Sequence, residues 1–201
     1  MMNINQLKNE LLVVIKNLHN KGWSPATSTN YSFKDKDNQI WVTRSGVDKS
    51  SITSEDFITI STDGNSMGEY VDCVPSAESV IHCVLYEIFP ETKFILHSHG
   101  PFPVLISSRF KSELKIQGYE LQKGFPNTRT HQTESIIPIF FNNQDMGYFK
   151  QELVRRKLQL KNNCFIIEKH GTYAWGNTLF DAKKHLETLD YLCQCEFLNG
   201  K

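Results

Sequence analysis

Three histidines in this sequence have the spacing and context of metal ligands. His97 and His99 lie two residues apart in the apolar run FILHSHG, and His170 closes a second apolar run, CFIIEKHG. In a strand, residues at i and i+2 project from the same face, so the first two rings can converge on one point. Three imidazoles with an open fourth position are typical of catalytic zinc, whereas structural zinc usually takes four protein ligands. We therefore predict a zinc site on these histidines with room for a substrate.

The expected chemistry at such a site is Lewis-acid chemistry on a carbonyl group. Oxygenases often add a carboxylate to their histidine ligands, but the stretch HSHGPFPVL contains no acidic residue. An all-histidine site favours polarisation of a carbonyl oxygen over activation of dioxygen. Imidazole sites accept several divalent metals, so the sequence leaves the metal in the cell open.

Three short turns rich in Gly, Ser, Thr and Asn could hold an anion. They are SPATSTN at 24–30, TRSGVDKSS at 43–51 and PSAES at 75–79. Hydroxyls and free backbone N–H groups at turns and helix starts are preorganised donors for anions. Lys49 could add a positive charge. The same residue types are also ordinary turn and capping residues, so each turn alone is a weak indication of ligand binding.

Charge and composition limit the class of partner. The 201 residues include 22 basic and 22 acidic side chains, a formal net charge of zero. This balance gives no overall basic surface for nucleic acid or an anionic membrane. The apolar stretch near the N-terminus ends at Lys16 and is too short for a signal peptide core or a spanning helix. Five cysteines without CxxC spacing indicate reduced thiols. We therefore expect a cytoplasmic protein with a small-molecule partner.

Helices interspersed with short strands must position the three histidines and the three turns. The periodicity predicts an opening helix that stops near Lys21, and it predicts strands that alternate with the later helices. No repeat or linker divides the chain, so we expect a single domain, 1–201, of the α/β class with a mixed sheet covered by helices. The expected helices are 76–89, 146–158 and 179–198, and the expected strands are 30–33, 39–44, 57–62, 93–99, 135–140 and 164–171, followed by a hairpin-like segment at 172–176. Residues 101–109 fit either a helix or a loop.

Six motifs, in their order and spacing, resemble the methylthioribulose-1-phosphate dehydratases of methionine salvage, within the class II aldolase superfamily. The motifs are GWSPATSTN, TRSGVDKSS, PSAES, HSH, GYELQKG and KHGTYAWG, and the resemblance spans about residues 7–198. It implies a three-layer αβα sandwich with a central, largely antiparallel mixed sheet, a homotetramer, and Zn²⁺ on the three histidines. It also implies a hydro-lyase that converts 5-methylthioribulose 1-phosphate to 5-methylthio-2,3-dioxopentyl 1-phosphate.

The resemblance further implies which residues hold the substrate phosphate. The superfamily's phosphate-binding positions fall on Thr27, Asn30, Ser45, Gly46 and Ser76. One departure is visible, because Thr29 stands where the family's turn usually has a glycine. A glycine there would permit positive φ or a close approach of the phosphate, so Thr29 bears on the shape of this turn.

Two glutamates compete for the acid/base role. Glu78 lies in PSAES at a helix start, where superfamily aldolases carry their acid/base carboxylate, although a helix N-terminus stabilises any carboxylate. Glu120 in GYELQKG matches the glutamate of the family's dehydratases, and the resemblance makes it the first choice as the base that takes the C3 proton. In the superfamily the site lies near a neighbouring subunit, so a catalytic group can also come from there.

Two other functions stay open at this stage. An aldolase or epimerase of the same superfamily would use the same metal but break the C3–C4 bond of a sugar phosphate. A non-catalytic scaffold, such as the adducin head, resembles the superfamily without its metal ligands. Retention of His97, His99 and His170 argues against a scaffold.

Overall fold

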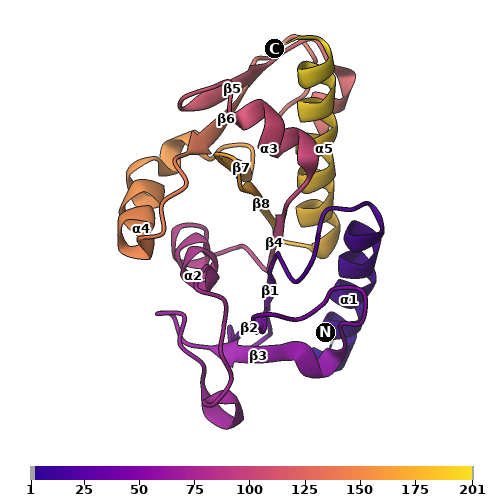
Figure 1. Ribbon diagram of the computed structural model, residues 1–201. Coiled ribbons are helices and arrows are strands. Elements are labelled where there is room, and N and C mark those ends of the chain that lie inside the picture. The colour runs from indigo at the N-terminus through magenta and orange to yellow at the C-terminus, as the bar shows by residue number, and fades with distance from the viewer. Residues whose placement is uncertain (1–2, 201) are drawn as a thin grey trace.

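The computed structural model describes residues 3–200, and its centre is one eight-stranded sheet with helices on both faces (Figure 1). The strand order is β3-β2-β1-β4-β8-β7-β6-β5. Every neighbouring pair is antiparallel except β6 with β7. The strands are β1 (Tyr31–Lys34), β2 (Ile40–Thr43), β3 (Phe57–Ile60), β4 (Phe94–Ser98), β5 (Glu113–Ile116), β6 (Ser135–Phe140), β7 (Cys164–Ile167) and β8 (Gly171–Gly176). The predicted α/β class and the largely antiparallel sheet are confirmed.

The helices form two outer layers. They are α1 (Ile4–Asn20), α2 (Ser79–Ile88), α3 (Pro101–Ser107), α4 (Met146–Arg155) and α5 (Leu179–Leu198). Helices α1, α3 and α5 lie on one side of the sheet, and α2 and α4 lie on the other (Figure 1). The predicted three-layer arrangement is therefore present.

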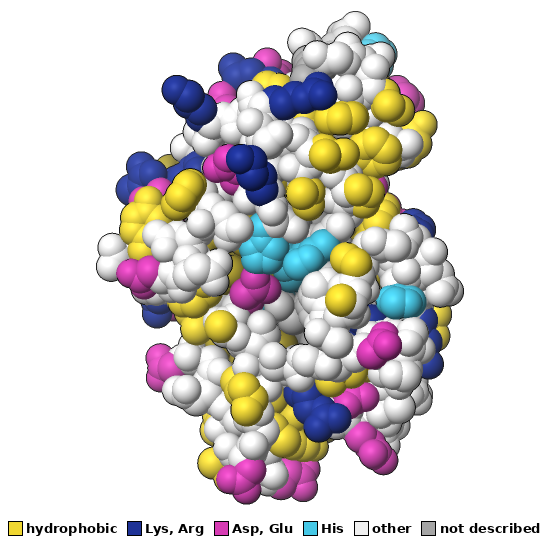
Figure 2. Space-filling view, in the orientation of Figure 1, with side chains coloured by type: hydrophobic (Ala, Val, Ile, Leu, Met, Phe, Trp, Pro, Cys, Tyr) yellow, Lys and Arg dark blue, Asp and Glu magenta, His cyan; other side chains and the backbone are white. Residues whose placement is uncertain are grey.

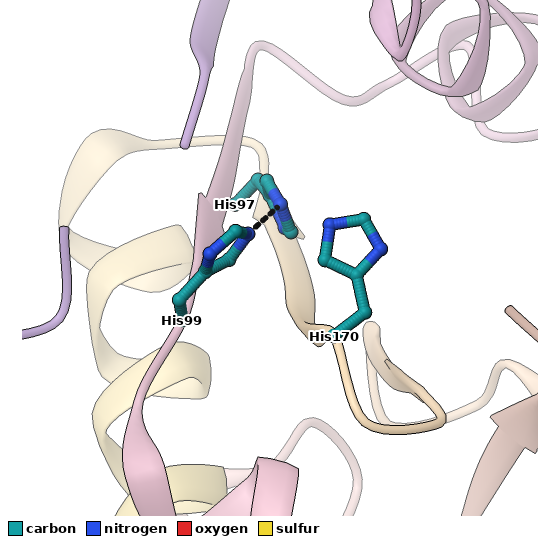
Figure 3. Close-up of side chains that lie close together, drawn as sticks. All are labelled: His97, His99 and His170. Atoms are coloured by element: carbon teal, nitrogen blue, oxygen red, sulfur yellow. Dashed lines mark hydrogen bonds between the residues drawn. The ribbon is translucent and has the colours of Figure 1, made fainter. Parts of the chain in front are cut away.

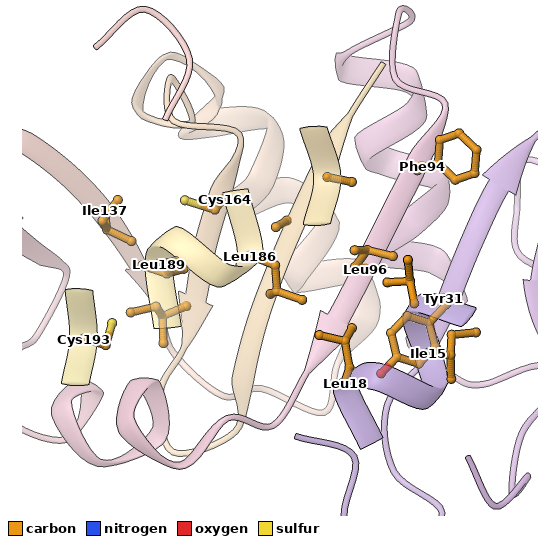
Figure 4. Packing of buried hydrophobic residues seen from close by; sticks show 14 of the residues in the cluster. Ile15, Leu18, Tyr31, Phe94, Leu96, Ile137, Cys164, Leu186, Leu189 and Cys193 are labelled. Atoms are coloured by element: carbon orange, nitrogen blue, oxygen red, sulfur yellow. The ribbon is translucent and has the colours of Figure 1, made fainter. Parts of the chain in front are cut away.

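Alternating residues of the strands pack into two separate hydrophobic cores, one on each face of the sheet. On β4, Phe94 and Leu96 pack in the core beneath α1 and α5, which Figure 4 shows from close by. Ile95, between them, packs in the second core beneath α2 and α4. Side chains of a strand alternate between its faces, so a central strand with helices on both sides is apolar at nearly every position. This explains why FIL runs without a polar interruption up to His97.

The differences from the predicted elements are local. Strand β5 was not predicted, because Glu113 and Lys115 alternate with buried Leu114 and Ile116 over only four residues at the sheet edge. The passage that fitted either helix or loop contains helix α3. Helix α2 begins at Ser79, a few residues later than expected. Within residues 3–200, the structure has no helix of the length and apolarity that a bilayer crossing requires.

Strands β4 and β8 pair in the middle of the sheet and bring the motif HSH against HGTYAWG. In the antiparallel register His97 faces Tyr173, and Ser98 faces Thr172. Gly171 allows this approach, because a Cβ atom there would lie 2.3 Å from the Ser98 carbonyl oxygen and 2.8 Å from Cδ2 of His99. Any larger residue would push the two strands apart next to the histidines.

Candidate metal centre

The three histidines lie together where β4 ends and the β7–β8 turn returns to the sheet (Figure 3). One ring nitrogen from each of His97, His99 and His170 lies within 4.8 Å of the other two. The Nε2 atoms of His97 and His99 are 2.9 Å apart. Nitrogens on a tetrahedral zinc with bonds of about 2.0–2.1 Å are roughly 3.3 Å apart, so small ring movements suit this trio to a cation.

The hydrogen bonding and burial of the rings leave them ready to bind a cation. Nδ1 of His97 donates to the Thr172 carbonyl oxygen at 2.9 Å, so its Nε2 carries the free lone pair. Burial lowers the pKa of His97 to about 4. Burial, followed by the neighbouring imidazoles, lowers the pKa of His99 to about 3. Both rings are neutral at neutral pH, as metal ligands must be.

Glu78 is the carboxylate that faces the trio. Its Oε1 lies 2.9 Å from Nε2 of His170, and its Oε2 lies 3.4 Å from Nε2 of His97. Burial raises the pKa of Glu78, but the imidazoles of His97 and His170 and the Asn30 amide lower it more, so the pKa lies well below its usual value. Glu78 occupies the N-cap position of α2 without a side-chain capping bond. The Glu78 carboxylate therefore contacts the histidines and does not cap the helix.

Two donors hold one oxygen of this carboxylate. Asn30 Nδ2 donates to Glu78 Oε2 at 2.7 Å, and the Tyr173 hydroxyl donates to the same atom at 3.1 Å. Tyr173 also stacks on His97, with ring centroids 4.2 Å apart. Sequence reasoning missed Tyr173, although its place in KHGTYAWG, opposite HSH on a paired strand, was a usable signal. The second oxygen, Oε1, stays directed at the trio.

A polar cavity of about 210 Å³ opens on this centre. Figure 2 shows histidine side chains in a hollow near the middle of this face, with an acidic side chain beside them. The structure brings the three predicted turns together here, and Gly46 adopts a φ of 74°. The cavity is lined by Thr27, Ser28, Thr29, Asn30, Arg44, Ser45, Gly46, Ser76, Glu78, His99 and His170.

Lys49 is the predicted anion-binding residue that does not line this cavity. Its side chain is buried, and Nζ donates to the Val47 carbonyl oxygen at 2.7 Å. Burial lowers the pKa of Lys49 to about 8. Arg44 lies at the cavity instead, paired with Asp56 at 2.8 Å and 51% exposed. Sequence reasoning missed Arg44, although it directly precedes Ser45 in a motif that had been singled out.

Thr29 adopts the backbone conformation for which the family uses glycine. Its φ is 72°, in the left-handed region that disfavours residues with a Cβ. Its hydroxyl donates to the Tyr31 hydroxyl at 3.2 Å, which offsets part of that cost. The turn therefore keeps the glycine-like conformation with a threonine in place.

We expect Thr29→Gly to be more stable than Thr29→Ala, the reverse of the usual order. Both variants lose the hydroxyl, but only alanine keeps the left-handed strain of about 1–2 kcal/mol, which exceeds the cost of about 0.4–1 kcal/mol from the higher chain entropy of glycine. The net difference of roughly 0.5–1 kcal/mol corresponds to a melting temperature about 1–4 °C higher for the glycine variant. Thermal unfolding followed by circular dichroism measures it. An alanine variant that melts at the same or a higher temperature would contradict a strained Thr29.

Glu120, the other predicted catalytic glutamate, lies on the surface of the chain. It opens a short 3-10 helix, η3 (Glu120–Gly124), and its side chain is 70% exposed. Its charged partners are Lys123, with which it forms a short ion pair, and His131, at 3.5 Å. Neither Glu120 nor these partners line the cavity at the histidine trio. Within one chain the structure therefore joins Glu78, but not Glu120, to the histidines.

An αβα sandwich with three histidines and a carboxylate at a polar cavity is the architecture of the class II aldolases. The chain belongs to the Class II Aldolase and Adducin N-terminal domain family, whose model matches residues 9–197. Its curated relatives include methylthioribulose-1-phosphate dehydratase of Picosynechococcus sp., which is 47% identical over 191 residues, 94% of this chain and 90% of that protein. The resemblance read from the motifs is confirmed. Class II aldolases are metal-dependent, and the trio gives this chain a possible site for the metal.

Solved structures agree on the fold. The l-fuculose-1-phosphate aldolase from Thermus thermophilus superposes with a TM-score of 0.78 at 21% identity, covering 98% of this chain and 96% of that one. YgbL from Escherichia coli superposes with a TM-score of 0.82 at 19% identity, covering 98% and 91%. At these identities the likeness shows the fold alone, and the choice of reaction depends on the dehydratase relatives and the site.

Proposed function

We propose that this chain dehydrates 5-methylthioribulose 1-phosphate to 5-methylthio-2,3-dioxopentyl 1-phosphate in methionine salvage. The main support is the 47% identity, over 94% of the chain, to a methylthioribulose-1-phosphate dehydratase. The site supports the same reaction, because neutral imidazoles, one carboxylate and a hydroxyl-lined cavity converge on a volume that suits the head of a sugar phosphate.

The substrate phosphate binds at the turns around Gly46. The hydroxyls of Thr27, Ser45 and Ser76 and the backbone N–H groups of these turns supply neutral donors, and Arg44 supplies the positive charge. His99 and His170 line the same cavity, so a phosphate bound at the turns leaves the sugar carbons next to the histidines.

His97, His99 and His170 hold a divalent cation, and an all-imidazole set with one open position favours zinc. Such a cation supplies Lewis-acid polarisation of the C2 carbonyl, which lowers the cost of removing a proton from C3. His97 keeps its productive tautomer through its bond to the Thr172 carbonyl oxygen.

Two carboxylates divide the proton transfers. Glu120 takes the proton from C3. Glu78, ionised and with Oε1 directed at the trio, takes the proton of the C3 hydroxyl and delivers it to the C4 hydroxyl, which leaves as water. The proton held by Glu120 then goes to C4, which completes the 2,3-diketone. The C3 proton thus moves to C4, and one molecule of water is lost.

Glu120 performs this step in the site of a neighbouring subunit. Its 70% exposure and its absence from the cavity of its own chain leave it free to project into another copy. We therefore include the homotetramer in the proposal, since closed symmetric assemblies repeat such a contact at every site. We also propose a cytoplasmic location, where the free thiols of the five cysteines stay reduced.

Product analysis tests the reaction. Purified, metal-loaded protein is incubated with methylthioribulose 1-phosphate and, separately, with fuculose 1-phosphate, and the products are identified by mass spectrometry. We expect a diketone about 18 mass units lighter than the first substrate, because one water is lost, and no cleavage of the second. An aldehyde product from fuculose 1-phosphate, with no diketone from the first substrate, would assign an aldolase instead.

A further inference from the structure

A continuous chain of buried hydrogen bonds runs from α2 through β1 to Glu78. The Tyr86 hydroxyl lies 2.9 Å from Ser32 Oγ, which lies 2.7 Å from Nδ1 of His82. Nε2 of His82 forms a short hydrogen bond with Oδ1 of Asn30, whose Nδ2 reaches Glu78 Oε2 at 2.7 Å. Tyr86, Ser32, His82 and Asn30 are all buried. The mechanism proposed above uses only the carboxylate at the end of this chain.

The carboxylate end of the chain fixes the direction of every hydrogen bond in it. Asn30 must turn its NH₂ group toward Glu78, since its carbonyl oxygen would repel the carboxylate. Oδ1 then faces His82, which must carry its proton on Nε2. Nδ1 of His82 is consequently an acceptor for the Ser32 hydroxyl. The Ser32 hydroxyl, with its hydrogen on His82, can only accept from Tyr86, whose hydroxyl also lies 3.5 Å from the Lys93 carbonyl oxygen.

Asn30 has no amide hydrogen left for the substrate in this arrangement. Its Nδ2 donates to Ser76 Oγ at 3.3 Å as well as to Glu78. Asn30 therefore lines the cavity as a residue that orients Glu78, although its position in the motif matches a phosphate-binding residue. The Glu78 carboxylate at one end of the amide and the N–H group of His82 at the other together keep the amide from flipping.

We propose that His82 is a positioning residue for the reaction: its Nε2–H group locks the Asn30 amide and thereby holds Oε2 of Glu78, so that Oε1 faces the three histidines. His82 is completely buried, and burial lowers its pKa to about 3, so the neutral ring offers one donor and one acceptor. A lone histidine in a helix is usually a packed residue, but this one bonds at both nitrogens. The expected effect of His82 on catalysis rests on the proposed function, whereas the hydrogen-bond arrangement does not.

Kinetics of two His82 variants separate positioning from packing. His82→Leu fills the space without a donor, while His82→Gln places an amide nitrogen near the former Nε2. We expect kcat of the leucine variant to fall about 10–100-fold and glutamine to restore most of it. We expect KM to stay within about 3-fold, because Arg44 and Ser45 of the phosphate site are not part of the hydrogen-bond chain. The control is His185→Gln. His185 is also buried, but its ring bonds the Trp175 backbone carbonyl oxygen and is not one of the residues of the hydrogen-bond chain that ends at Glu78.

Imidazole NMR tests the inference without substrate. In protein labelled with ¹⁵N-histidine, long-range proton–nitrogen correlations should show His82 protonated at Nε2 and bare at Nδ1, with the signals assigned by their absence from His82→Gln. A proton on Nδ1 would overturn the inference, as would unchanged kcat in His82→Leu or an equal loss of kcat in all three variants. If wild-type protein does not turn over the ketose phosphate, the proposed function fails while the NMR result still decides the hydrogen-bond chain.

Discussion

Replacing His170 with alanine should abolish both metal retention and turnover. The two histidines that remain, His97 and His99, hold a cation far less tightly than three, and the C2 carbonyl then loses its polarising partner. We expect kcat/KM to fall by about 10³-fold or more, beyond the loss typical of one missing oxyanion donor. Elemental analysis of dialysed protein and the dehydration assay measure the two effects on the same sample.

The matched control for this experiment is His19→Ala. His19 lies at the end of α1, where Nδ1 is 3.3 Å from the Ser24 carbonyl oxygen, and it does not line the cavity. We expect that variant to keep its metal and its activity. If His170→Ala also kept a full equivalent of metal and wild-type turnover, the trio could not be the catalytic centre.

Mixing two inactive variants should restore activity if Glu120 acts on a neighbouring subunit. Glu120→Gln keeps an intact histidine trio, and His97→Ala keeps an intact Glu120. The two variants are co-expressed in equal amounts. A site is active when a Glu120→Gln subunit, which supplies the three histidines, lies next to a His97→Ala subunit, which supplies Glu120. Random assembly in a ring predicts about one quarter of wild-type activity. The activity of doubly tagged hybrid protein measures the recovery.

The control mixture combines His97→Ala with His170→Ala. Both substitutions damage the same cluster within one chain, so no hybrid contains a site with a complete trio unless a wild-type subunit is present. We expect this mixture to stay inactive. Equal inactivity of the Glu120→Gln mixture would show that Glu120 serves its own chain, after a movement of η3, whereas full activity of Glu120→Gln alone would show that Glu120 has no catalytic role.

The histidine trio was predictable because strand geometry is local. The i, i+2 spacing of His97 and His99 sets their common face without any knowledge of the fold, and His170 was recognised from its place after an apolar strand. The motif resemblance then supplied the turns that line the cavity. These are features that a short stretch of sequence carries by itself.

The parts that escaped prediction depend on contacts between distant segments. Whether Lys49 or Arg44 reaches the cavity depends on burial of one side chain and on the ion pair of the other with Asp56. The role of His82 escaped prediction, because its partners Ser32 and Asn30 lie about 50 positions earlier in the chain. Edge strand β5 had too few residues to show a period. Sequence spacing cannot rank such long-range contacts.

Because the site depends on the pairing of β4 with β8, we expect it to form late in folding. His97 and His99 come from one strand and the residue after it, and His170 comes from the turn that leads into another strand, with α3, α4 and three strands between them in the chain. Long-range strand pairing is slow compared with helix formation. A partly folded chain therefore has an incomplete histidine trio, and a cation bound to the complete trio would tie β4 to the β7–β8 turn. We therefore expect an added divalent cation to stabilise only the fully folded subunit.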